Sequence, residues 1–241
     1  MKSHRLILAI ISLGLASPAM AGPSEAVAPA EDHNPWTVEA SLLYLFSHDN
    51  ETSDFGYRNQ DHEEGYRLKL GYQPTPDFFN FSLSYLYYRG TERGKFDENG
   101  PRLDIVDFEL SKGFDWGFAE GTYSFGLRSM QLYEPYGGGG DVDYTGFGPL
   151  ASIELVRPLS GAFSIYCGLE SAFTFGDDDA EQANDGIFQG QFEIGVQYDT
   201  TIMGADSYIR LGYEHQFYHS ATYGAGDAQI SGFALTVGTG F

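Results

Sequence analysis

The stretch that decides the fold is Gln229–Phe241, which reads QISGFALTVGTGF. Phe233, Leu235 and Val237 alternate with glycine, alanine and threonine, so large apolar and small residues fall on opposite faces of an extended chain. A two-residue period of this kind indicates a β-strand. An exposed strand edge invites unwanted pairing, and closing the sheet into a barrel removes that edge. The stretch therefore predicts the last strand of a closed membrane barrel, and the alternative is the edge strand of a soluble sandwich.

This strand ends on an aromatic residue, Phe241. An alternating strand with a final phenylalanine resembles the signal by which outer-membrane barrels are recognised for assembly. We therefore expect the barrel-assembly machinery to be a partner of the C-terminal strand.

Residues 1–21 are typical of a secretory signal peptide. Lys2 and Arg5 form a charged start, an apolar run covers 6–15, and Ala19-Met20-Ala21 forms a cleavage site. The run is too short to span a bilayer as a helix. Residues 22–35 are rich in Pro, Ala and acidic residues and are predicted to be a flexible periplasmic lead-in. The remaining segment, 36–241, is predicted to form the barrel.

Ten segments of this region alternate between apolar and polar residues, each close to or somewhat longer than the ~9–11 residues of a tilted membrane strand. The predicted fold is therefore an all-β, transmembrane antiparallel β-barrel of about ten strands, within a range of eight to twelve. Short turns are expected at 74–78, 113–119, 158–161 and 199–206, and longer outer loops at 48–63, 89–102, 134–144, 176–186 and 219–229. The ten segments are 36–47, 64–73, 79–88, 103–112, 120–133, 145–157, 162–175, 187–198, 207–218 and 230–241.

Aromatic residues make up 16% of the chain and gather at the ends of the predicted strands. Membrane barrels carry such girdles at both lipid–water interfaces, so we expect a location in the outer membrane of a Gram-negative-type bacterium. The expected partners there are outer-membrane lipid and lipopolysaccharide. The predicted periplasmic girdle consists of Trp36, Tyr72, Phe79, Trp116, Tyr198 and Phe241.

Charged residues occupy the opposite faces of the same strands, where they cannot face lipid without a large free-energy cost. They are predicted to line the lumen. One interpretation is a narrow porin-like channel for small solutes or ions with a mild cation preference, because acids outnumber bases. The alternative is a structural or adhesive surface barrel whose lumen is closed by ion pairs and whose acidic loops make the contacts. The predicted lumen residues are Glu39, Arg67, Lys69, Asp107, Glu109, Arg128, Glu154, Glu170, Glu193, Arg210 and Glu214.

Other classes of function have little support in the sequence. A net charge of −21 argues against nucleic acid as a partner. The acidic run Asp177, Asp178 and Asp179 is a weak candidate for a metal site, because carboxylates bind Ca²⁺ but the run lacks the calcium-loop pattern. His219 and Ser220 are adjacent on a strand and point to opposite faces, so they do not form a catalytic pair. We expect no enzyme activity, no catalytic residue and no cofactor.

The middle of the chain carries a succession of short motifs. RLDIVDFELSK at 102–112 is followed by FGLR at 125–128, YTGFGP at 144–149, SIEL at 152–155, RPL at 157–159 and FTFG at 173–176. This succession resembles the family of pore-forming outer membrane proteins similar to the Legionella major outer membrane protein, over about residues 64–176. The resemblance implies a pore-forming outer-membrane β-barrel, and it supplies no catalytic residue.

Overall fold

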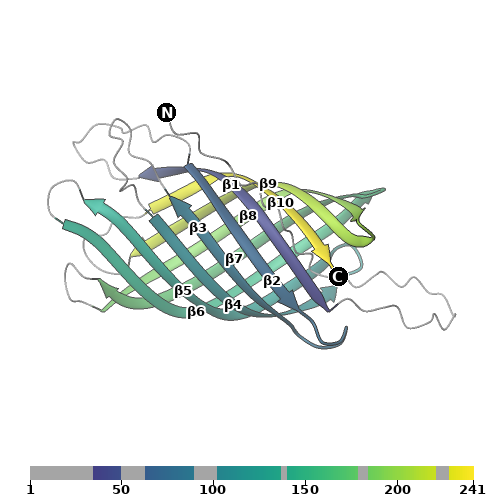
Figure 1. Cartoon of the computed structure of the whole chain (residues 1–241), viewed down its shortest axis with the longest axis horizontal. Helices are drawn as coiled ribbons and strands as arrows, with labels where there is room; N and C mark the ends of the chain where they lie inside the picture. Colours follow the sequence, from purple (N-terminus) through teal and green to yellow (C-terminus); the bar gives the residue numbers. More distant parts are fainter. Residues whose placement is uncertain (1–34, 50–62, 90–101, 137–139, 179–183, 221–227) are drawn as a thin grey trace.

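The computed structural model describes residues 35–49, 63–89, 102–136, 140–178, 184–220 and 228–241, which form a closed antiparallel barrel of ten strands (Figure 1). The closed all-β prediction is confirmed. The predicted signal peptide, and the lead-in up to residue 34, lie outside the described residues. The strands are β1 (Trp36–Asp49), β2 (Glu63–Tyr72), β3 (Asn80–Arg89), β4 (Arg102–Asp115), β5 (Glu120–Tyr136), β6 (Gly140–Ser160), β7 (Phe163–Asp178), β8 (Asn184–Ile202), β9 (Ala205–Ser220) and β10 (Ala228–Gly240).

The barrel closes between its first and last strands. The ladder between β1 and β10 runs from Thr37 opposite Gly240 to Asp49 opposite Ala228. Beyond it, the backbone N–H groups of Trp36 and Phe241 each donate to the other residue's carbonyl oxygen, at 3.2 and 3.0 Å. Between β1 and β2, by contrast, the assigned ladder consists of one pair, Trp36 opposite Tyr72.

The strands are strongly tilted. Following paired residues once around the barrel from Asp49 leads through each of the remaining strands, from β10 to β2, and arrives at Gly71, which lies beside Thr37 of β1. The path thus returns to β1 a full 12 residues from where it left, at Thr37 instead of Asp49. A shift of this size requires a tilt of roughly 35–45° in a closed barrel, and the oblique course of the strands is visible in Figure 1.

The two ends of the barrel differ. We call the end with Trp36, Phe241 and the connections at 73–79, 116–119, 161–162 and 203–204 the turn end, toward the right in Figure 1. The opposite end, the loop end, is where the chain continues into 50–62, 90–101, 137–139, 179–183 and 221–227. Among the described residues no helix has the length and apolar character needed to cross a membrane.

Several strands are longer than expected. The predicted turn at 199–206 is wrong, because β8 and β9 continue as a hairpin around Met203 and Gly204 alone. The turns predicted at 113–119 and 158–161 likewise shrink to 116–119 and 161–162, and β5 and β6 occupy most of the predicted loop 134–144. Backbone pairing continues beyond the segments that alternate between apolar and polar residues. The added strand ends have polar sequences without this alternation, so the sequence pattern does not predict them.

The predicted strand 145–157 places the Gly-Phe-Gly-Pro stretch at 146–149 near its entry. Instead β6 begins at Gly140, so Pro149 lies well inside it. Between Phe147 and Leu150 no pair with β7 is assigned, whereas pairing with β5 is continuous there. Proline has no N–H to donate, so the interruption on one side only is the expected cost of this residue in the wall.

The interior is divided along the barrel axis. Toward the loop end it is filled by an apolar layer, which was not predicted from the sequence. Charged residues mark the inward faces in the sequence, whereas apolar residues of the same parity do not stand out. The apolar layer consists of Leu43, Leu45, Leu86, Tyr88, Leu103, Ile105, Met130, Tyr144, Ile187, Tyr218, Ile230 and Ala234.

Candidate functional site: the charged interior

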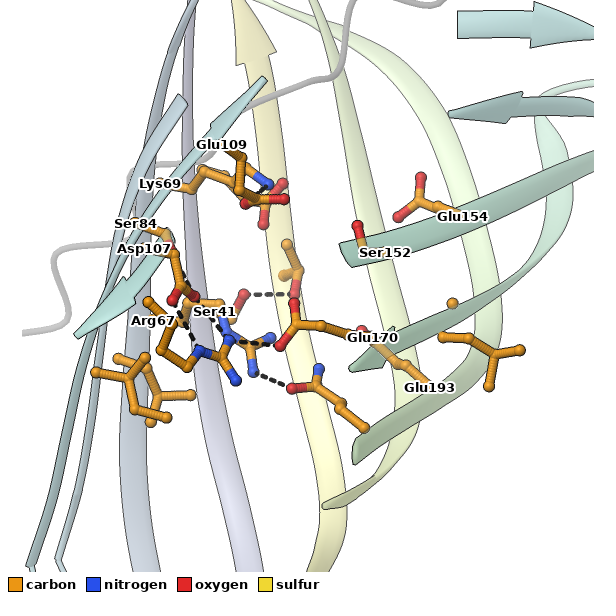
Figure 2. A pocket seen from close by; sticks show the side chains of 18 of the residues that line it. Ser41, Arg67, Lys69, Ser84, Asp107, Glu109, Ser152, Glu154, Glu170 and Glu193 are labelled. Atoms are coloured by element: carbon orange, nitrogen blue, oxygen red, sulfur yellow. Dashed lines mark hydrogen bonds and ion pairs between the residues drawn. The ribbon is translucent and has the colours of Figure 1, made fainter. Parts of the chain in front are cut away.

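The charged half of the interior surrounds a cavity of about 120 Å³. Figure 2 shows Lys69 beside Glu109 at one end of the cavity, with Glu154, Glu170 and Glu193 across from Asp107. These side chains come from five different strands, β2, β4, β6, β7 and β8. They point inward because inward-facing and outward-facing positions alternate along each strand. Ten of the eleven predicted lumen residues line this cavity, and Glu214 is buried next to it.

Arg67 and Lys69 on β2 are each bonded to a carboxylate. Arg67 donates from both terminal nitrogens to Glu214, at 2.8 and 3.2 Å, and the Glu214 side chain is fully buried. Lys69 donates to Oε1 of Glu109 at 2.7 Å, while Ser124 donates to the other oxygen at 2.6 Å. Both carboxylates therefore have their charge compensated and their oxygens occupied, which buried charges require.

Arg128 on β5 is the most densely bonded base. It donates through Nε and Nη2 to the two oxygens of Asp107, at 2.8 Å each, in the bidentate geometry that favours Arg over Lys. It also donates to Glu170 at 2.5 Å and to Gln189 at 2.9 Å. With its side chain only 7% exposed, Arg128 joins β4, β5, β7 and β8 across the lumen.

Arg210 on β9 lies closer to the turn end. It donates to both oxygens of Glu154 at 2.8 Å and to Gln197 at 2.7 Å. Its guanidinium lies over the rings of Tyr166 and Tyr208, 4.6 and 4.5 Å from their centroids. A cation held between two aromatic faces and a carboxylate is both charge-compensated and sterically confined.

The two tyrosines extend this cluster to the remaining acids. The Tyr166 hydroxyl donates to Glu193 at 2.6 Å, and the Tyr208 hydroxyl donates to Glu39 at 2.7 Å. All seven predicted acids thus accept a hydrogen bond from an interior side chain. Each of the four predicted bases is bonded to at least one of them.

Neutral interior residues were missed by reading charges alone. Gln189, Gln191 and Gln197 accept hydrogen bonds from Arg128, Arg67 and Arg210 respectively. Each lies on the same strand parity as Glu193. Their parity is the signal in the sequence that identifies them as inward-facing.

The predicted aromatic girdle lies on the outer surface around the turn end. Trp36 contacts Tyr72 with ring centroids 4.6 Å apart, and Tyr198 contacts Phe163 at 5.0 Å. Between the girdle and the loop end the outer surface exposes mainly leucine, isoleucine, valine and phenylalanine. The six predicted girdle residues, Trp36, Tyr72, Phe79, Trp116, Tyr198 and Phe241, are all exposed.

The weak metal candidate lies largely outside the described residues. The backbones of Asp177 and Asp178 belong to β7, but their side chains, and the whole of Asp179, lie outside the described residues. Within the described ranges no group of three or more His, Cys, Asp or Glu residues could hold a metal ion.

Comparison with known proteins gives distant similarities. No family model matches the chain, and no curated protein sequence matches it. Among solved structures, Neisserial surface protein A has a TM-score of 0.40 at 13% identity, covering 86% of this chain and 97% of that one. The beta domain of the Bordetella autotransporter BrkA gives 0.40 at 12%, covering 86% and 97%. A Pseudomonas aeruginosa FadL homologue gives 0.38 at 9%, covering 86% and 91%. Similarity this distant assigns neither a family nor a function.

Proposed function

We propose that the protein is a β-barrel of the outer membrane of a Gram-negative-type bacterium, with its turn end in the periplasm. The support is the exterior: the ten strands close into a barrel, the form in which a β-sheet can span a bilayer, and the wall exposes apolar side chains between aromatic rows. Phe108, Leu127 and Leu211, for example, are each about half exposed on three different strands. Such a surface is unfavourable in water and stable in a bilayer.

We further propose that the barrel is closed at rest and acts at the bacterial surface as a structural or adhesive protein. The observation that carries this choice is the state of the interior bases: Arg67, Lys69, Arg128 and Arg210 are each bonded to a carboxylate. Toward the loop end the apolar layer follows, and apolar constrictions block ions by excluding water. An ion crossing the barrel would have to break ion pairs and then enter a dry layer.

The test is the conductance of purified protein refolded into a planar bilayer, measured in symmetric salt and under a salt gradient. Insertion is verified by heat-dependent gel migration of the same preparation. We expect folded protein to give no discrete conductance steps. Frequent steps from folded protein would contradict the closed barrel.

A narrow porin-like channel with a cation preference is the second candidate, favoured by the cavity and by the excess of six acids over four bases that line it. Gly168 provides a specific test, since a Cβ atom built there has no heavy atom within 4 Å and the residue lines the cavity. In a channel, Gly168→Leu would lower the conductance without disturbing the wall. In a closed barrel, neither wild type nor Gly168→Leu gives conductance steps.

A further inference from the structure

Two arginines lie directly opposite each other on the outer surface at the loop end. Arg89, the last residue of β3, pairs with Arg102, the first residue of β4. Both have the parity of the exposed outward residues and both are exposed. Like charges directly opposite on adjacent strands are destabilising. In a chain with only 13 basic residues against 34 acidic ones, this juxtaposition calls for a compensating anion.

The structure supplies only part of that compensation. Arg102 donates from Nε to Oδ2 of Asp104 at 2.5 Å, and Tyr85 donates to Oδ1 of the same carboxylate at 2.5 Å. Asp104 is thus occupied on both oxygens, while Nη1 and Nη2 of Arg102 have no acceptor among the described residues. Glu64 is the cross-strand neighbour of Arg89, but the two form no ion pair within the described part of the chain.

The surroundings are aromatic and apolar. The guanidinium of Arg102 lies 5.6 Å from the ring centroid of Tyr87, which stacks on Tyr66 at 5.3 Å. Beyond Asp104 on the same outward face of β4 are the exposed Val106 and Phe108. A pair of cations at the rim is therefore continuous with an apolar surface running toward the turn end.

We propose that Arg89 and Arg102 bind a phosphate group of the phosphorylated glycolipid of the outer leaflet, whose acyl chains lie along the outward faces of β3 and β4. Guanidinium groups recognise phosphate through paired N–H donors, and the free terminal nitrogens of Arg102 are such donors. Asp104 is a positioning residue that fixes the guanidinium. The inference rests on the proposed membrane location, which places the loop end in the outer leaflet.

The test uses native mass spectrometry of the full-length protein in detergent micelles with diphosphoryl lipid A, and with the same lipid after removal of its phosphates. We expect wild type to retain the diphosphoryl form, and Arg89→Gln with Arg102→Gln to bind it about tenfold more weakly. Arg157→Gln removes an exposed arginine near the turn end and should leave binding unchanged. Glu64→Gln should strengthen binding, because it removes a negative charge next to Arg89 that repels the phosphate.

Inorganic phosphate at millimolar concentration distinguishes a lipid phosphate from a free one. If phosphate displaces the lipid completely, or if the lipid binds equally well without its phosphates, the proposed lipid site is wrong. Equal retention by wild type and the double variant would also overturn it. Arg89→Gln alone, expected to weaken binding severalfold, serves if the double variant folds poorly. Protein that never inserts into lipid vesicles would instead refute the proposed membrane location.

Discussion

At the scale of single residues, Arg128 stands out because it donates four hydrogen bonds to interior side chains. We expect Arg128→Met to lower the free energy of unfolding by about 3–5 kcal/mol, because it leaves Asp107 and Glu170 buried without their cation. The measurement is urea unfolding of the protein in lipid vesicles, followed by gel migration. Arg157→Met, at an exposed arginine, is the matched control.

A second variant distinguishes the loss of the Arg128 charge from the loss of packing by its side chain. Replacing Arg128, Asp107 and Glu170 together by Met, Leu and Leu removes all three charges and should recover much of the loss. If the triple variant is no more stable than Arg128→Met, the buried carboxylates are not the cause of the destabilisation.

Met203 is a residue in an unfavourable conformation. It has a φ of +53° and is followed by Gly204 at +87°, and both form the two-residue turn between β8 and β9. Hairpin turns with two positive φ values favour Asn-Gly. We expect Met203→Asn to raise the unfolding midpoint by about 2 °C, and Met203→Leu, which keeps an ordinary side chain, to leave it unchanged. A lower midpoint for the asparagine variant would contradict this account of the turn.

At the scale of elements, the contact between β1 and β2 is expected to be the weakest part of the wall. Its assigned ladder is the single pair Trp36–Tyr72, whereas β1 pairs with β10 along nearly its whole length. Amides without a stable partner exchange by small local openings. Hydrogen exchange in detergent should therefore be faster on the side of β2 facing β1 than on its side facing β3. Equal protection of both sides would show that this seam is as stable as the others.

At the scale of the whole molecule, the apolar layer should control water entry. Ile105 and Met130 are cross-strand neighbours and both are buried in it. Changing both to Ser should produce conductance steps in a bilayer where wild type gives none, because hydroxyl groups stabilise water in the constriction. Val106→Ser, at the adjacent outward position on β4, is the control. A silent but folded double variant would place the closure in the ion pairs instead.

Much of the architecture follows from local sequence. The alternation of Phe233, Leu235 and Val237 with small residues specifies a strand and its two faces, because the side-chain period of an extended chain is two. The same alternation in ten segments predicted the closed barrel and the inward orientation of the charged lumen residues. The extension of β8 and β9 to the turn at Met203 was not predictable in this way, since the polar sequence at the strand ends does not alternate.

The sequence by itself therefore determined the strands, their faces and the side of the wall on which each charge lies. Only the tertiary structure decided which charges meet and at what depth: that Arg128 reaches Asp107 and Glu170, that Arg210 lies between Tyr166 and Tyr208, and that Leu45 and Met130 share one layer. The physical reason is register. Depth inside a tilted barrel depends on the shift between neighbouring strands, summed around the closed wall, and that shift is set by pairing across the sheet and not by any one strand.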